Sequence, residues 1–172
     1  MAGLIYASYP NTDTVALTCT LNSLASDTNL LAGRQCTAIS NVTNNDLDAI
    51  ISGQFKVGTS PTSGNLIYVY AFGPRLVSSG TPTYPDTLGA TDANVSITSA
   101  NIRNNTLKLV CALTVDATTG RVYDIPPTSL AMLFGGSLPL RWGLWVVHNT
   151  GVALDASAGG NLYYTRVQAQ YT

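Results

Sequence analysis

The only histidine of this sequence is its best candidate for acid–base chemistry. His148 ends the apolar stretch "RWGLWVVH" and is followed by "NTG", in which Asn149 and Gly151 are typical of a turn. Nucleophilic catalysis needs a serine, a cysteine or an acid held against the base. No such residue or cluster of acids stands close to His148 in the sequence. We therefore predict a structural histidine where a buried strand meets its turn.

Carboxylates are the second group of candidates, and the chain has nine aspartates and no glutamate. Most aspartates lie in strings typical of turns, such as "SDT", "YPDT" and "LDAS", where the side chain caps its own backbone. The scattered aspartates do not exclude a pair of catalytic carboxylates of the kind that glycosidases use. We predict, however, that they cap turns. The string "NNDLDA" (44–49) lacks the glycine and closing glutamate of a calcium loop. We predict no catalytic residue, no metal site and no cofactor, and therefore no enzyme.

Alternating apolar residues predict the elements that surround these candidates. Such alternation is typical of strands, and the turn signals between the segments favour antiparallel pairing. The segments are 14–24, 33–40, 49–58, 65–73, 95–98, 106–115, 120–125, 141–148 and 161–171. We predict an all-β fold, an antiparallel β-sandwich of jelly-roll type with about nine strands. At most one short helix is expected, near 128–134, where prolines precede a possible cap and glycines follow.

The segment 141–148 holds both tryptophans and is apolar on both faces. Trp142 shares one face with Leu144, whereas Trp145 lies on the other. This strand is therefore covered on both sides, either by its own domain alone or by the domain and a partner. Tyr68 and Tyr70 also share a strand face with Phe72, and Tyr163, Tyr171 and Trp145 are further candidates for exposed aromatic platforms. We expect these rings in the core or in a subunit interface, with sugar stacking as the alternative.

The three cysteines have no metal-binding spacing. Cys19 alternates with Val15, Leu17 and Leu21, so it is expected to be a small core residue. Cys111 is expected to face the core in the same way, together with the residues that alternate with it: Leu107, Leu109, Leu113 and Val115. Reduced thiols and synthesis in the cytoplasm are the default for such an odd set. The first ten residues lack the basic region of a signal peptide.

Composition restricts the partners. Charged residues make up 10% of the chain and the net charge is −1, which gives no basic field for binding nucleic acid. The longest apolar runs are too short to span a membrane as a helix. The surface must instead be covered by the hydroxyls and amides of 22 threonines, 14 serines and 13 asparagines. So weakly charged a surface favours self-association.

One domain is expected over 15–172, because a chain of this length can bury a sufficient core. The segment 1–14 precedes it as an arm or an edge strand. Residues 73–94 are predicted to form one long loop with three of the eight prolines. Loops of this length are usually functional or ordered by a partner.

Several uncommon strings in the chain resemble a family of tailed-bacteriophage proteins. They include "SLASDTNLLAGRQCTAISNVTNN", "LDAIISGQFKVGTSPT", "TPTYPDTLGATDA" and "LFGGSLPLRWGLWVVHNTG". Members of this family are capsid decoration or cement proteins, which are viral structural proteins of the virion. The resemblance covers nearly the whole chain and is weakest before residue 14. It transfers no catalytic residue, and the family has serine where this chain has Cys36.

The resemblance implies a protein that oligomerises as a dimer or trimer and bridges subunits of the phage major capsid protein. It would be synthesised in the cytoplasm of the bacterial host and lie on the capsid exterior. From apolar and irregular character, we predict partner contacts at Ile5, Tyr6, Tyr9, Pro10, Tyr84 and Pro85. A carbohydrate-binding module for host-surface attachment, displayed on the virion, is the alternative.

Overall fold

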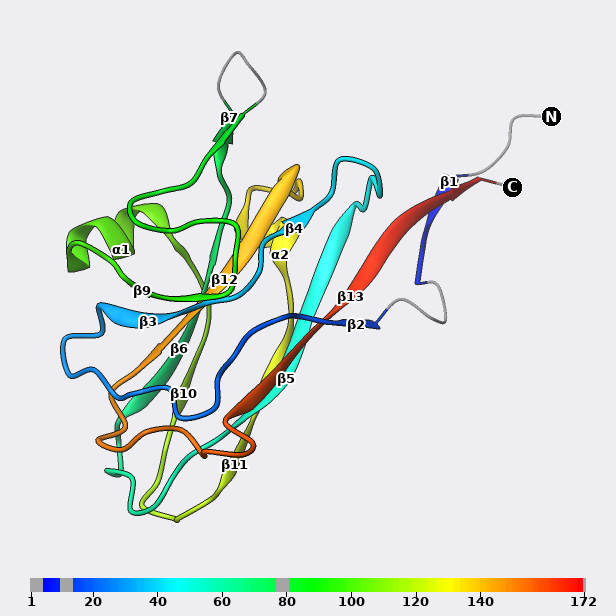
Figure 1. The fold of residues 1–172 in the computed structure, drawn as a ribbon. Helices are drawn as coiled ribbons and strands as arrows, with labels where there is room; N and C mark the ends of the chain where they lie inside the picture. The colour runs from blue at the N-terminus through cyan, green and yellow to red at the C-terminus, as the bar shows by residue number, and fades with distance from the viewer. Residues whose placement is uncertain (1–4, 10–13, 77–80, 172) are drawn as a thin grey trace.

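The computed structural model describes residues 5–9, 14–76 and 81–171 of the chain. Two antiparallel sheets pack face to face (Figure 1). The first sheet has the order β1–β13–β5–β11, with β2 also paired to β13. Its strands are β1 (Ile5–Ser8), β2 (Thr14–Ala16), β5 (Asp48–Lys56), β11 (Val122–Ser129) and β13 (Gly160–Tyr171).

The second sheet has the order β10–β6–β12–β3–β9, with β4 also paired to β12. Its strands are β3 (Ala32–Gln35), β4 (Ile39–Ser40), β6 (Leu66–Phe72), β9 (Ala93–Ser96), β10 (Lys108–Thr114) and β12 (Arg141–His148). The all-β antiparallel sandwich is thus confirmed. The strand order does not confirm the jelly-roll connectivity. The described residues form thirteen strands where about nine were expected, because the segment 33–40 is divided between β3 and β4 and because β1, β7 and β8 lie outside the predicted segments.

The main core lies between the two sheets, and β12 explains how the sequence builds it. Trp142, Leu144 and Val146 point into this core, and each is at most 1% exposed. Trp145 and Val147 point to the other face, where a second apolar cluster buries them completely. The prediction of a strand covered on both faces is confirmed, and this chain supplies both covers.

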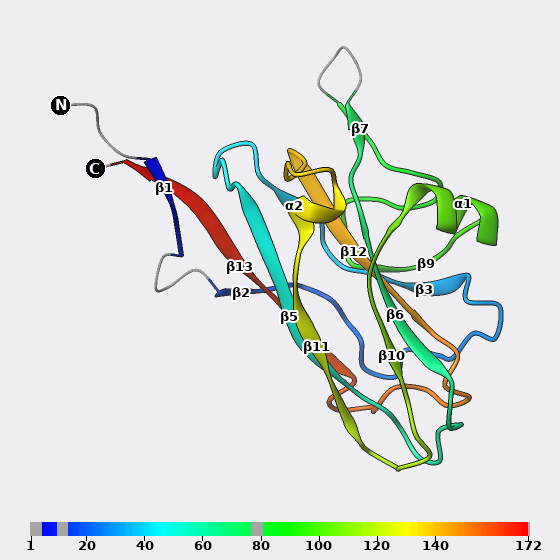
Figure 2. The same cartoon turned by 180° about the vertical axis from the view of Figure 1, so that it is seen from behind.

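A helix missed by the sequence analysis covers that second cluster. In Figure 2, α1 (Ala100–Thr106) lies outside the second sheet. The Ser99 hydroxyl caps it by accepting a hydrogen bond from the Ile102 N–H (3.2 Å). Ile102 packs on the cluster, and the Arg103 guanidinium lies 5.9 Å from the ring centre of Tyr70. The expectation of at most one helix is therefore wrong: tertiary contacts stabilise α1 although its asparagines are weak helix formers.

The predicted short helix is present as α2 (Leu130–Leu133). The loop predicted over 73–94 contains a small hairpin of β7 (Arg75–Leu76) and β8 (Pro82–Thr83), and β9 begins at its end. This hairpin pairs with neither main sheet and extends away from the sandwich (Figure 1). Neither helix in the described residues is long and apolar enough to cross a membrane.

Two predicted strands depart from simple alternation. The segment 14–24 is a strand only as far as Ala16, and Val15 is exposed instead of buried. In β10, the register shifts between Leu109 and Cys111, which is a β-bulge. The bulge turns Leu109 out to 47% exposure and buries Val110 in its place. The expected inward position of Leu109 is therefore wrong.

Cys19 and Cys36 form a disulfide, which contradicts the expectation of reduced thiols. Their Cα atoms are 4.3 Å apart, and Cys36 is fully buried in the main core. The two segments also hydrogen-bond beside the bridge, where the Thr37 N–H donates to the Thr18 carbonyl (2.8 Å). Sequence spacing could not reveal this pair, because different strands position the two segments: Cys36 follows β3, which pairs with β12 and β9, and Cys19 follows β2, which pairs with β13. Cys111 remains a free, partly buried thiol.

Candidate functional site

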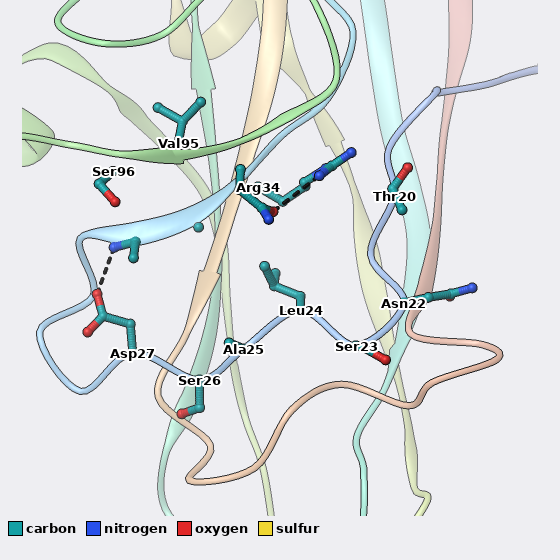
Figure 3. A pocket seen from close by; sticks show the side chains of 13 residues that line it. Thr20, Asn22, Ser23, Leu24, Ala25, Ser26, Asp27, Arg34, Val95 and Ser96 are labelled. Carbon is teal, nitrogen blue, oxygen red and sulfur yellow. Dashed lines mark hydrogen bonds between the residues drawn. The ribbon is translucent and has the colours of Figure 1, made fainter.

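One pocket is lined mostly by residues of the loop that this disulfide closes. Its volume is about 620 Å³, within the range of ligand-binding pockets. Residues 20–27 form one wall, and β3 and β9 form the other (Figure 3). The lining residues are Thr20, Asn22, Ser23, Leu24, Ala25, Ser26, Asp27, Ala32, Gly33, Arg34, Asn94, Val95 and Ser96.

Asp27 holds the turn that closes one end of the pocket. Its carboxylate accepts hydrogen bonds from the backbone N–H groups of Asn29 (3.0 Å), Leu31 (2.7 Å) and Ala32 (2.7 Å). Burial by itself would raise the pKa of Asp27, but these three bonds outweigh it and hold the pKa below its ordinary value. Asp27 is therefore ionised and committed to its own loop, as capping predicts.

An ion pair between Arg34 and Asp92 lies at the other end of the pocket. The Arg34 Nε donates to Asp92 Oδ1 at 2.6 Å, and the Thr20 hydroxyl donates to Asp92 Oδ2 at 2.5 Å. The Arg34 Nη1 also donates to the Asn94 side-chain oxygen (3.2 Å). The hydrogen bond to Asp92 raises the pKa of Arg34 against the effect of burial. For Asp92, burial raises the pKa, but Arg34 and Thr20 together lower it below its usual range. The two charges neutralise each other, so this end offers hydrogen bonds and no net field.

The remaining lining is apolar or neutral. Leu24 points toward the middle of the pocket, and Val95 lies on the opposite wall (Figure 3). None of the described lining residues is aromatic. Sugar-binding surfaces rely on exposed rings that stack on pyranose faces, so this pocket does not favour the carbohydrate alternative. No local pattern in the sequence indicates this pocket, because the disulfide and β9 assemble it from distant segments.

The predicted aromatic stripe is part of the fold. Tyr68 and Tyr70 on β6 stack with ring centres 6.0 Å apart, and Tyr70 lies 5.8 Å from Trp145. Tyr70 is 7% exposed and Trp145 is completely buried, which confirms the core interpretation for these two rings. Tyr163 on β13 is exposed, so this ring does not lie in the core. The side chain of Tyr171 lies outside the described part of the structure.

His148 is fully buried at the end of β12, which confirms its structural interpretation. Its Nε2 lies 3.0 Å from the Leu24 carbonyl oxygen, and its Nδ1 lies 2.9 Å from the Thr150 hydroxyl. Since a carbonyl can only accept, Nε2 carries a proton and donates it to the Leu24 carbonyl, whereas the Thr150 hydroxyl donates to the Val152 carbonyl (2.9 Å). Burial lowers the pKa of His148 against the raising effect of the Leu24 carbonyl. The neutral imidazole therefore ties Leu24, a pocket residue, to the second sheet.

We expect this buried histidine to make stability depend on pH. Its ordinary pKa is 6.5, and the folded value is lower, so the unfolded chain binds the proton first as pH falls. The free energy of unfolding should therefore fall below pH 6.5, by at most about 1.4 kcal/mol per pH unit. Urea unfolding between pH 5 and 7 measures this slope.

The matched variant for this pH dependence is His148→Gln, which keeps hydrogen-bonding capacity and cannot titrate. It should be less stable than the wild type at pH 7 and lose most of the slope between pH 5 and 7. The prediction is contradicted if both proteins show the same slope, because the aspartates would then be its source.

Other aspartates also stabilise local structure. Asp86 accepts hydrogen bonds from the N–H and hydroxyl of Thr98 (2.7 and 2.5 Å), which lower its pKa. Asp46, in the string that resembles a calcium loop, is 7% exposed and pairs with Arg166 (Nη2–Oδ1 2.9 Å). Gln168 also donates to Asp46 (3.0 Å). Within the described residues, no three metal-ligating side chains cluster together.

The predicted contact residues fall into two separate groups. Ile5 and Tyr6 lie in β1, but their side chains are outside the described structure. Tyr9 follows β1 and is 62% exposed, and Pro10 lies outside the described residues. Figures 1 and 2 place β1 far from the β7–β8 hairpin, near which the second group lies. The structure therefore does not bring the two groups into one site.

Tyr84 and Pro85 follow β8 and line the second, smaller pocket of about 300 Å³ with Arg75. The ring of Tyr84 meets Phe72 edge-on, with centres 6.1 Å apart. Its hydroxyl oxygen is buried and has no hydrogen-bond partner among the described residues. Tyr84 therefore packs the chain that follows β8 against the second apolar cluster.

The fold and site define a class of protein: an antiparallel β-sandwich in which His148, Asp27 and Asp86 make hydrogen bonds that hold the chain's own structure. No protein-family model matches the chain, and a search of curated proteins also found no match. The likeness to phage decoration proteins consequently stays a prediction.

Proposed function

We propose that this protein decorates the exterior of a bacteriophage capsid and cements neighbouring subunits of the major capsid protein. The observation that carries this proposal is the pair of projecting elements. The end of β13 with β1 extends from one side of the sandwich, and the β7–β8 hairpin extends from another (Figure 1). A cement protein needs two separated contact regions on one rigid body, because it must touch two capsid subunits at once.

The two elements coincide with the contact residues predicted from the sequence, Tyr9 beside β1 and Tyr84 and Pro85 beside β8. A role in binding agrees with the chemistry of the pocket, where Arg34 and Asp92 neutralise each other. The Cys19–Cys36 disulfide suits a particle that leaves the reducing cytoplasm of its host. The protein is thus proposed to act by adding contacts, with no reaction of its own.

The mechanism is mass action. A protein that binds the assembled lattice and not its free subunits stabilises the lattice by RT ln(1 + [L]/Kd) at each site. Each contact can be weak, because an oligomer that engages several capsid subunits gains avidity of about 10²–10⁴. The expected outcome is a shell that resists heat and pressure better when it is decorated.

Heat release of DNA from purified heads tests this function. Heads stripped of the protein should release DNA at a lower temperature, and added recombinant protein should restore the original temperature. The variant Tyr9→Asp should restore less, because it places a charge in a predicted contact. The control Met132→Ser changes a side chain that is 76% exposed on α2, which belongs to neither projection, and should restore fully. Equal heat resistance of stripped and decorated heads would contradict the proposal.

A further inference from the structure

The edges of the two sheets differ in how well they are protected. Exposed edge strands pair readily with other chains unless prolines, bulges, charges or short length prevent it. The edge strand β11 contains Pro126 and Pro127, and its register shifts between Ile125 and Thr128. The edge strand β10 begins with Lys108 and has its own bulge. Both edges are therefore blocked.

Two other edge strands, β2 and β9, offer little backbone for pairing with another chain. β2 has only three residues. β9 has four, and two of its carbonyls are occupied: Val95 accepts from the Trp145 indole N–H (3.3 Å) and Ser96 from the Thr87 hydroxyl (2.6 Å). These edges have little free backbone to offer a partner.

β1 is as short as β9, with four residues, but it has no proline, no bulge and no charge. Its sequence, "IYAS", contains no charge and no proline. Its register with β13 is uninterrupted from the pair Ile5–Tyr171 to the pair Ser8–Gln168. β1 lies at one end of the strand order of the first sheet. Within the described residues, its outer edge therefore has no partner strand.

β1 and the end of β13 also form a ribbon of only two strands. The pairing of β13 with β5 ends at Val167, and residues 168–171 pair only with β1 among the described residues. We call residues 5–8 and 168–171 the terminal ribbon. Figures 1 and 2 show it extending beyond the sandwich. A two-stranded ribbon is marginally stable in water by itself, and a third strand stabilises it.

We propose that the outer edge of β1 pairs antiparallel with β1 of a second copy of this chain, so that two terminal ribbons join into one four-stranded sheet. Antiparallel pairing of identical strands is self-complementary about a two-fold axis. The strings "IYAS" and "QAQY" are uncharged, so no like charges oppose each other. Ala7 and Ala169 form an exposed cross-strand pair whose small side chains allow a close neighbour. This inference rests on the self-association contained in the proposed function and specifies its surface.

The length of the contact sets its strength. Four residues on each side bury far less than the roughly 1,200–2,000 Å² of a stable interface. We therefore expect weak, concentration-dependent pairing of the free protein. On a capsid, where copies are held side by side, the same contact gains strength through avidity.

Charge complementation at Ala7 tests the pairing. The variants Ala7→Glu and Ala7→Lys each place like charges across the two-fold axis, and a mixture of the two places opposite charges there. Sedimentation equilibrium should show at least about tenfold weaker association for each variant alone than for their mixture. The control pair, Val122→Glu and Val122→Lys, charges an exposed position on the blocked β11 edge and should show no such difference. Thermal unfolding confirms that each variant is folded.

Cross-linking locates the contact. Single cysteines at positions 5–8 lie close to the two-fold axis, within reach of a short bis-maleimide. Background is low, because Cys19 and Cys36 are bridged and burial raises the pKa of the Cys111 thiol to about 11. Ala7→Cys should give several-fold more covalent dimer than the edge control Val122→Cys. Equal yields, or equal association of the Ala7 variants alone and mixed, would overturn the ribbon pairing. If such a protein still protects heads, the capsid role stands without it.

Discussion

Replacing Trp142 with alanine is expected to lower the free energy of unfolding by about 3–5 kcal/mol. Trp142 is 1% exposed between the two sheets, and its ring meets Tyr164 of β13 edge-on, with centres 5.1 Å apart. The substitution removes this contact between the sheets and leaves a cavity that the paired strands cannot fill by moving. Because domains of this size have about 5–15 kcal/mol of stability, the loss is a large part of the total.

Urea unfolding followed by circular dichroism measures this loss. The control is Met132→Ala on α2, which truncates a side chain that is 76% exposed and should change stability by less than about 0.5 kcal/mol. A Trp142→Ala protein as stable as this control would show that the two sheets do not pack on Trp142.

Loss of the Cys19–Cys36 disulfide should have the second largest effect. The bridge closes a loop with a sequence separation of 17 residues, for which the chain-entropy model gives about 3 kcal/mol. The double variant Cys19→Ala and Cys36→Ala, or reduction of the wild type, should remove this stabilisation. The same loop carries residues 20–27 and β3, so the larger pocket should lose its shape as well.

The unfolding midpoint in urea, with and without a thiol reductant, checks this expectation. The wild type and the control Cys111→Ala should both lose stability on reduction, because Cys111 takes no part in the bridge. The double variant should not respond. Wild-type protein with three titratable thiols under non-reducing conditions would contradict the disulfide directly.

The local sequence pattern was sufficient to predict strand β12 and the roles of several turn residues. The alternation in 141–148 predicted β12 and its two apolar faces, since a strand places successive side chains on opposite sides. The turn chemistry after His148 and around Asp27 and Asp86 predicted their structural roles. The all-β class followed from a composition rich in threonine, serine and asparagine and free of glutamate.

The candidate site was largely unpredictable. Its walls come from residues 20–27, β3 and β9, and its ion pair joins Arg34 to Asp92, 58 residues away in the chain. The sequence pointed instead to the two groups around Tyr9 and Tyr84, which the structure places on separate projections. Neither the pocket nor this separation has a local signature.

The sequence alone thus determined the all-β class, the two-faced tryptophan strand and the position of His148 at the end of a strand, because these follow from composition and from residues a few positions away. The partner of His148, the Leu24 carbonyl, is 124 residues away and was decided by the tertiary structure. Tertiary structure decided the bulge that turns Leu109 outward, the bridge from Cys19 to Cys36, and the stability of α1. It also left β1 as an unprotected edge. These features depend on which distant strands meet and in what register, and the free energy of those contacts outweighs local preference.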